Sequence, residues 1–312
     1  MNTRATRQAE IVEVAPRDGF QSIAEPLPTH NKISLIEGLL DAGCQRLELG
    51  SFVSPRAVPQ MADMGGIAEH FKGRPGLRLS VLVPNAKGAE LALAHGIREL
   101  VYVFSASETH NLKNVRQTIE QSLTQLAEIT AMRRDERDFR LRVDIATCFD
   151  CPFDGTVPFG QVRYAVERVA EVAGTAEIAL CDTTGRANPH QVRSRFAAVM
   201  GTTGEGIGWA FHGHDTFGMG VANALFAYEA GVRTFDASAA GLGGCPFAPG
   251  ASGNTATEDL VFAFGEAGIH TSIDMFGLLT VADRIAGLPG ACVGGHLRKV
   301  PRARAIPASA TA

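Results

Sequence analysis

The hydrophobic positions of the chain fall into short runs that recur along most of its length. Polar stretches and glycines separate these runs. Short apolar runs bounded in this way are typical of strands that are buried on both faces, as in a parallel sheet. We therefore expect eight strands, at about residues 11–14, 46–49, 79–83, 99–104, 140–146, 176–180, 207–212 and 233–237.

Between these runs, apolar residues recur with the helical period. Four times, a helical pattern stops at a glycine and an apolar strand follows, in segments 41–49, 95–103, 172–180 and 229–237. Glycine ends a helix readily because it adopts the left-handed conformation that the C′ position requires. The clearest helical patterns are Lys32–Asp41, Val115–Arg133, Gly160–Val172, Pro189–Val199 and Gly218–Ala230.

Eight strand–helix units predict the α/β class and a (β/α)8 TIM barrel. The rival architecture, a doubly wound open sheet, would favour a glycine-rich phosphate loop after the first strand, and the sequence has neither GxGxxG nor a P-loop there. Residues 255–290 predict two extra C-terminal helices. We therefore expect one catalytic domain over 1–290, followed by a flexible tail over 291–312, which is basic and then rich in Pro and Ala.

The composition narrows the class of protein. The 312 residues are 45% hydrophobic and 20% charged, with a net charge of −4, so we expect no nucleic-acid partner. No apolar run approaches the ~20 residues that span a bilayer, and the polar N-terminus does not resemble a secretion signal. The six cysteines do not suggest a disulfide framework, so a cytoplasmic location is expected. Cys148 and Cys151 form a single CxxC, which we interpret as core thiols.

Polar residues gather where the expected strands end, and in TIM barrels this rim holds the active site. The sharpest element is His212-Gly213-His214. Residues i and i+2 of an extended chain point the same way, so both imidazoles would face one point, with Gly213 leaving room between them. Asp18 and Asn254 would add two oxygens. Two nitrogens and two oxygens suit Mg²⁺ or Mn²⁺, and Zn²⁺ is a less favoured alternative.

Two further charged residues lie at the same rim. Arg17 follows the first strand, where its permanent charge could stabilise an oxyanion. Glu48 ends a buried strand, where an unpaired charge would be costly, so we expect it to contact Arg17 or a metal ligand. Asp215 is interpreted as a helix cap rather than a partner of the metal ligands.

A loop rich in Gly and Pro, residues 241–254, follows the eighth strand and carries Cys245. Disulfide partner, metal ligand and nucleophile are alternative roles for this thiol. A general acid that is delivered by loop closure fits a glycine-rich loop best.

These elements resemble hydroxymethylglutaryl-CoA lyases, a family of metal-dependent barrel lyases related to isopropylmalate synthase. The resemblance covers about residues 10–290. It implies cleavage of a 3-hydroxy-3-methylglutaryl thioester to acetyl-CoA and acetoacetate. The motifs that carry it are Val12–Gln21, Ser51–Pro55, Val58–Asp63, Ala106–Thr109, His212–Asp215 and the 241–254 loop.

The resemblance also implies roles for single residues. Asp18, His212, His214 and Asn254 would bind the metal, and Arg17 would stabilise the enolate. Cys245 would be the loop acid or base, His212 would help to remove the C3 hydroxyl proton, and Glu48 matches the family's active-site carboxylate. The expected partner is an acyl-CoA substrate, and the resemblance is compatible with a homodimer. The Lys87 region or the Asn111–Asn114 stretch would contact CoA or simply begin a helix.

The chain departs from the family pattern at Phe20, Ser22, Ile23 and the segment 181–186. These positions lie near the expected acyl pocket and leave the acyl group open. The alternatives are therefore a lyase for a different 3-hydroxyacyl-CoA and a condensing synthase of the isopropylmalate or homocitrate type. Such synthases carry extra C-terminal domains and lack the cysteine-bearing glycine loop, which favours a lyase.

Overall fold

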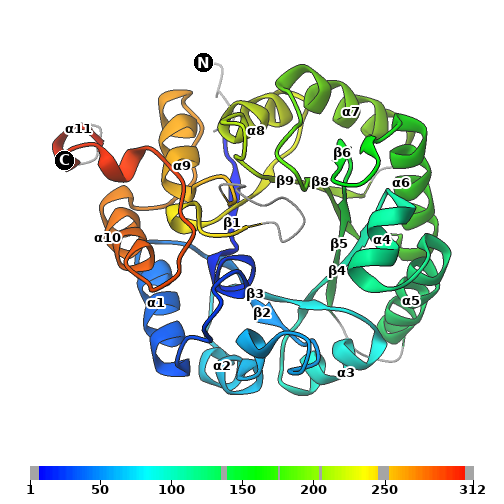
Figure 1. Ribbon diagram of the computed structural model, residues 1–312, viewed down its shortest axis with the longest axis horizontal. Coiled ribbons are helices and arrows are strands. Elements are labelled where there is room, and N and C mark those ends of the chain that lie inside the picture. The colour runs from blue at the N-terminus through cyan, green and yellow to red at the C-terminus, as the bar shows by residue number, and fades with distance from the viewer. Residues whose placement is uncertain (1–6, 135–138, 175, 204–205, 245–252, 306–312) are drawn as a thin grey trace, which may run out of the picture.

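The architecture is a closed barrel of eight parallel strands surrounded by helices (Figure 1). It comes from a computed structural model, which describes residues 7–134, 139–174, 176–203, 206–244 and 253–305. The strands follow the order β1-β10-β9-β8-β5-β4-β3-β2 around the barrel, which confirms the expected TIM barrel. They are β1 (Glu10–Glu13), β2 (Arg46–Ser51), β3 (Arg78–Val83), β4 (Glu99–Ser105), β5 (Arg140–Ala146), β8 (Glu177–Asp182), β9 (Gly208–Gly213) and β10 (Thr234–Ala237).

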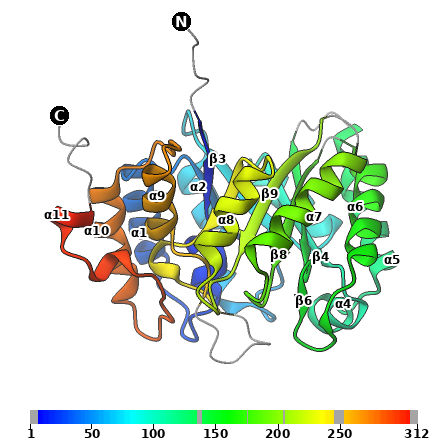
Figure 2. The ribbon, with the colours of Figure 1, turned by 90° about the horizontal axis from the view of Figure 1, so that it is seen from above.

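The helices form the outer layer, and apolar side chains from alternate strand positions pack against them. A short antiparallel hairpin, β6 (Asp150–Cys151) and β7 (Gly155–Thr156), follows β5. In Figure 2 this hairpin and α4 lie at the lower end of the barrel, where the strands finish. The α-helices are α1 (Thr29–Asp41), α2 (Met64–Phe71), α3 (Ala86–Ala94), α4 (Glu108–Val115), α5 (Ile119–Ala131), α6 (Phe159–Ala173), α7 (Pro189–Thr202), α8 (Gly220–Glu229), α9 (Thr257–Glu266), α10 (Met275–Ala286) and α11 (Arg302–Ala305).

The helix expected over Val115–Arg133 corresponds to α5 and begins later, at Ile119, so that prediction was wrong in its first residues. Arg116 has a φ of 58°, which ends α4 in the left-handed conformation. A new helix then starts at once, because Thr118 and Gln121 form a reciprocal capping box at the N-terminus of α5.

The expected pair of C-terminal helices is present as α9 and α10, but the tail prediction needs correction. Residues 291–305 pack against the barrel instead of forming a flexible tail. Leu297 is buried, and its backbone N–H donates to Asp259 on α9 at 2.8 Å. Arg302 pairs with Asp283 on α10 at 2.5 Å. Apolar burial and these polar contacts hold the segment, and the basic composition did not reveal them.

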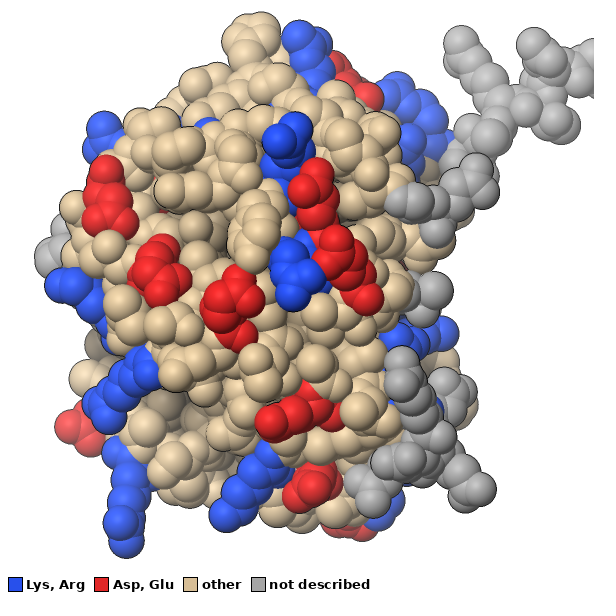
Figure 3. Space-filling model, turned by 90° about the vertical axis from the view of Figure 1, so that its right-hand side faces the viewer, with Lys and Arg blue, Asp and Glu red and all other residues tan. Residues whose placement is uncertain are grey.

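The outer surface is charged in a mixed pattern. On the side formed by α5 and α6, acidic and basic side chains are interspersed (Figure 3). Two such pairs lie along α6, Arg163 with Glu167 and Arg168 with Glu171. None of the helices within the described ranges has the length and apolarity that crossing a bilayer requires.

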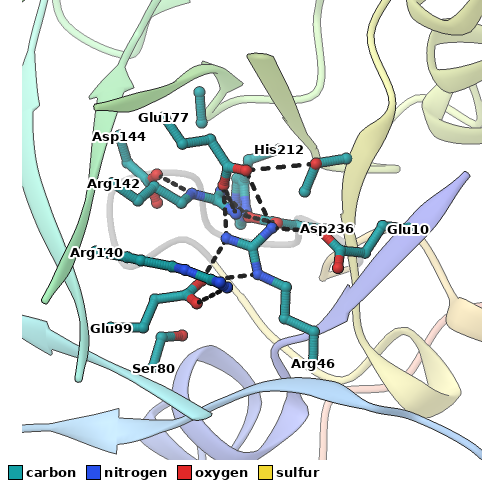
Figure 4. Close-up of polar contacts among 12 residues, drawn as sticks. Glu10, Arg46, Ser80, Glu99, Arg140, Arg142, Asp144, Glu177, His212 and Asp236 are labelled. Carbon is teal, nitrogen blue, oxygen red and sulfur yellow. Dashed lines mark hydrogen bonds and ion pairs between the residues drawn. The ribbon is translucent and has the colours of Figure 1, made fainter. Parts of the chain in front are cut away.

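The inside of the barrel holds charged side chains, where many TIM barrels hold layers of branched apolar ones. Arg46 is buried and pairs with Glu99 at 2.5 Å and Glu177 at 2.7 Å. Arg142, also buried, pairs with Asp144 and Asp236, both at 2.6 Å (Figure 4). Because desolvated charges need partners, these ion pairs constrain how the strands of the barrel pack.

Truncating Arg46 tests this constraint. Arg46→Ala removes the buried guanidinium that Glu99 and Glu177 share, and breaking a buried pair typically destabilises a protein by ~3–5 kcal/mol. We expect a clearly lower urea midpoint, followed by circular dichroism. Arg168→Ala on the surface of α6 is the control and should leave the midpoint nearly unchanged. Equal midpoints for both variants would contradict a structural role for the interior pairs.

Candidate active site

The turn after β1 carries the first two predicted site residues. It is a π-helical turn, η1 (Ala15–Gly19), in which the N–H groups of Asp18 and Gly19 both donate to the carbonyl of Val14. Single π turns occur frequently at functional sites. This turn leads the chain out of β1 and places Arg17 and Asp18 at the C-terminal mouth of the barrel.

The end of β9 supplies the two histidines. Candidate ligand atoms of Asp18, His212 and His214 all lie within 4.8 Å of one another. The ring centroids of His212 and His214 lie 5.2 Å apart. Gly213 is needed for a reason other than the expected one: a Cβ there would lie 2.7 Å from Cε1 of Phe211. Within the described ranges, this is the one group of three or more His, Cys, Asp or Glu side chains that is arranged to hold a metal ion.

Asn254 lies at the same point. It forms an isolated antiparallel bridge with His214, and its Nδ2 donates to Asp18 Oδ2 at 2.7 Å and to the carbonyl of Leu242 at 3.2 Å. The structure thus brings all four predicted ligands together, with the amide nitrogen of Asn254 facing Asp18. Rotating the amide by about 180° about its terminal torsion would exchange that nitrogen for the predicted ligand oxygen.

The approach of Asn254 depends on glycines at the base of the 241–254 loop. A Cβ at Gly243 would lie 2.5 Å from Nδ2 of Asn254, and a Cβ at Gly253 would lie 2.4 Å from the carbonyl oxygen of Gly241. No other residue type fits these contacts without movement of the backbone or of Asn254. Cys245 lies outside the described residues.

The surroundings of Asp18 and His214 favour the protonation states of these two side chains that bind a metal. Burial alone would raise the pKa of Asp18, but the charges of Arg17, His212 and His214 outweigh burial and lower it. Burial, followed by repulsion from His212, lowers the pKa of His214 to about 4. Nδ1 of His214 is buried and has no hydrogen-bond partner in the described part of the chain. An ionised carboxylate and a neutral imidazole are the forms that coordinate a cation.

Arg17 connects this group to the predicted carboxylate. Its Nη1 lies 2.5 Å from Asp18 Oδ1, and its Nε lies 2.9 Å from Glu48 Oε2. The expected contact between Glu48 and Arg17 is therefore confirmed. Burial raises the pKa of Glu48 to about 7, although Arg17 opposes this rise. A carboxyl group with such a pKa can hold or release a proton near neutral pH.

Sequence reasoning missed one residue of the site, Asp236 on β10. Its Oδ2 accepts a hydrogen bond from Nδ1 of His212 at 2.9 Å. Burial alone would lower the pKa of His212, but this hydrogen bond and the negative charge of Asp236 outweigh burial and raise the pKa of His212. The sequence did offer a signal for this residue, since Asp236 is a carboxylate inside the expected strand 233–237.

The other singled-out residues have structural surroundings. Cys148 and Cys151 are buried, and Cys148 donates to the carbonyl of Ile145 at 3.0 Å, which agrees with core thiols. Asp215 accepts a hydrogen bond from the N–H of Gly220, the first residue of α8, at 2.7 Å. It therefore caps this helix with its side chain, although the N-cap position itself is Met219.

The residues suggested as CoA contacts include both exposed and buried side chains. Lys87 is exposed on α3. Asn111 is buried, and its amide bonds to the backbone of Ser105 and Gln117. Nζ of Lys113 lies 4.2 Å from the ring centroid of Phe153. Of these residues, Asn111 therefore holds the β4–α4 connection together and is not exposed to a ligand.

The departures from the family pattern also separate into core and surface positions. Phe20 and Ile23 are buried in the main hydrophobic core, and the hydroxyl of Ser22 donates to the carbonyl of Gly19. Arg186 is largely exposed and lies over the ring of Phe217 at 5.1 Å. The two apolar departures are thus packing residues.

Comparison with known proteins agrees with this geometry. A family model described as HMGL-like matches residues 8–285. The chain belongs to the HMGL-like family. This membership confirms the resemblance found in the motifs, and the names of the relatives favour an oxo-acid lyase over a condensing synthase.

Three relatives of this HMGL-like protein are informative. The (R)-citramalyl-CoA lyase of Chloroflexus aurantiacus is 40% identical over 90% of this chain and 90% of its own. The 3-hydroxy-3-isohexenylglutaryl-CoA/hydroxymethylglutaryl-CoA lyase of Pseudomonas aeruginosa is 36% identical over 96% of this chain and 99% of its own. The structure of an HMG-CoA lyase from Acinetobacter baumannii in complex with coenzyme A and 3-methylmalate superposes with a TM-score of 0.88, at 40% identity, over 96% of this chain and 97% of that one.

Removing one imidazole tests the candidate metal site. We expect His214→Ala to abolish tight Mn²⁺ binding in isothermal titration calorimetry, because it deletes one of the candidate ligands. His190→Ala, which removes an exposed imidazole from α7, is the control and should bind as the unmodified protein does. Stoichiometric Mn²⁺ retained by His214→Ala would rule out this ligand set.

Proposed function

We infer that the protein is a divalent-metal-dependent lyase that cleaves a 3-hydroxy-3-methylglutaryl-CoA-like thioester to acetyl-CoA and acetoacetate. One observation carries this proposal: Asp18, His212 and His214 converge at the C-terminal mouth of the barrel, and Arg17 contacts Asp18 there. The donor set of one carboxylate, two imidazoles and the Asn254 amide suits Mg²⁺ or Mn²⁺. A bound divalent cation would supply Lewis-acid polarisation of the substrate oxygens.

The cleavage has simple requirements. The C3 hydroxyl loses a proton and becomes a carbonyl as the C2–C3 bond breaks. The bonding electrons pass to C2 and form the enolate of acetyl-CoA, which then takes up a proton to give acetyl-CoA. The protein must therefore accept one proton, stabilise an oxyanion and deliver one proton.

Arg17 and Cys245 meet two of these requirements in the proposal. Arg17 is held in place by Glu48 and Asp18 and provides a fixed positive charge for the enolate oxygen. Cys245 delivers the proton to C2 from the loop after β10. When that loop covers the bound substrate, it also excludes water, which strengthens the electrostatic contacts.

The acceptor of the hydroxyl proton has two candidates. The family resemblance assigns this role to His212, but Nδ1 of His212 is bonded to Asp236. Its Nε2 would then have to serve both the metal and the proton. Glu48 is the second candidate, because its Oε1 is buried without a hydrogen-bond partner among the described residues and its pKa of about 7 suits a base at neutral pH.

The acyl group also has a second candidate. The relative named (R)-citramalyl-CoA lyase is as similar to this chain, at 40% identity, as the HMG-CoA lyase from Acinetobacter baumannii. Citramalyl-CoA has one methylene fewer between C3 and the terminal carboxylate, and its cleavage gives pyruvate in place of acetoacetate. The same residues would catalyse both reactions, since the reacting atoms are the same.

A substrate comparison tests the function. We expect the Mg²⁺- or Mn²⁺-loaded protein to release acetyl-CoA and acetoacetate from hydroxymethylglutaryl-CoA, measured by coupled assays for both products. Citramalyl-CoA, assayed for pyruvate, should give a lower kcat/KM. A higher value for citramalyl-CoA would reassign the substrate, and no acetyl-CoA from either thioester would refute the proposal.

Substitution of the loop thiol tests the proton donor. We expect Cys245→Ala to lower kcat by at least ~10²-fold, the low end for loss of a general acid, and to leave Mn²⁺ binding intact. Cys292→Ala removes another thiol and should retain full activity. If Cys245→Ala turns over at the normal rate, the thiol is not the acid.

A further inference from the structure

A carboxylate and a guanidinium lie directly behind one of the proposed metal ligands. Nη1 and Nη2 of Arg142 donate to the two carboxylate oxygens of Asp236, at 2.8 and 2.6 Å. Oδ2 of Asp236 also accepts from Nδ1 of His212 at 2.9 Å (Figure 4). The three side chains come from β5, β10 and β9, so this contact spans three barrel strands.

The orientation of Asp236 is closely restricted. The paired bonds from Arg142 define the plane of the carboxylate, because the guanidinium is planar and permanently charged. Arg142 itself is held by Asp144, which accepts from its Nε at 2.6 Å. Arg142 and Asp236 are both buried, and thus water does not compete for these bonds.

This arrangement determines which nitrogen of His212 can reach the metal site. An ionised carboxylate only accepts hydrogen bonds, so Nδ1 of His212 must carry the proton. The lone pair of a neutral imidazole is then on Nε2. Fixing the tautomer of a metal-binding histidine in this way is a common role of a carboxylate behind the ligand.

We propose that Asp236, oriented by Arg142, is a positioning residue that holds His212 in the Nδ1–H tautomer and thereby presents Nε2 for metal binding. The proposal rests on the metal site of the proposed function. A purely structural ion pair between Arg142 and Asp236 would affect stability alone. A positioning role also affects the tautomer of His212 and the affinity for the metal.

The substitution Asp236→Asn separates these two roles. With its amide oxygen bonded to Nη1 of Arg142, Asn would place its nitrogen where Oδ2 now accepts from Nδ1 of His212, and it would donate to Nδ1. This would place the proton of His212 on Nε2, where it competes with the metal. We expect Mn²⁺ affinity to fall by ~10–100-fold, as for other such partners of metal ligands.

The tautomer is measured directly in metal-free protein by long-range ¹H–¹⁵N correlation spectroscopy, at a pH where His212 is neutral. We expect Nδ1–H in the unmodified protein and Nε2–H in Asp236→Asn. Mn²⁺ affinity is measured on the same samples by calorimetry. Glu177→Gln is the matched control: it removes a carboxylate that lies 3.7 Å from Arg142 and leaves the bond from Asp236 to His212 in place, so both readouts should be unchanged.

Two results would overturn the proposal. The first is the Nε2–H tautomer in unmodified protein, which needs no variant and therefore holds even if Asp236→Asn does not fold. The second is Mn²⁺ affinity that is equal in Asp236→Asn and Glu177→Gln. The tautomer is measured without metal or substrate, so failure of the proposed lyase reaction gives a different result from failure of this inference.

Discussion

The structure depends on the neutralisation of guanidinium groups inside the barrel. Arg46 and Arg142 are almost sealed from solvent, and an isolated charge in that position would be prohibitively unfavourable. Each is therefore paired with carboxylates, which come from other strands of the barrel except for Asp144, a neighbour of Arg142 on β5. Because these carboxylates are spread around the barrel, the strands must pack in the arrangement that brings each carboxylate to its arginine.

The same constraint shapes the mouth of the barrel. Asp236 completes the pairing of Arg142 and at the same time bonds to His212. Arg17 is likewise shared between Asp18 and Glu48. Two of the candidate ligands, Asp18 and His212, are thus the outer members of ion-paired sets whose inner members are buried. This explains how a group of charged residues can be rigid before a cation or a substrate binds.

Much of this could be predicted from the sequence, and the reasons are local. Apolar runs gave the eight strands, and the spacing of His212 and His214 gave the metal-site hypothesis. Asp236 was missed because its partner depends on β10 lying beside β9, which is a tertiary contact. The interior charges Arg142 and Asp144 were visible two residues apart in one strand, but partners on other strands cannot be read from one strand. The packed segment 291–305 was missed because its contacts with α9 and α10 depend on how the chain turns back over these helices.

The glycine contacts at the base of the 241–254 loop have a consequence for protein engineering. Gly243 and Gly253 lie against Asn254 and Gly241 so closely that no side chain fits there, and Asn254 is bridged to His214. Gly243 and Gly253 are therefore fixed positions for any redesign of the acyl specificity. A side chain at either glycine would push apart the backbone segments that hold the amide of Asn254 beside Asp18.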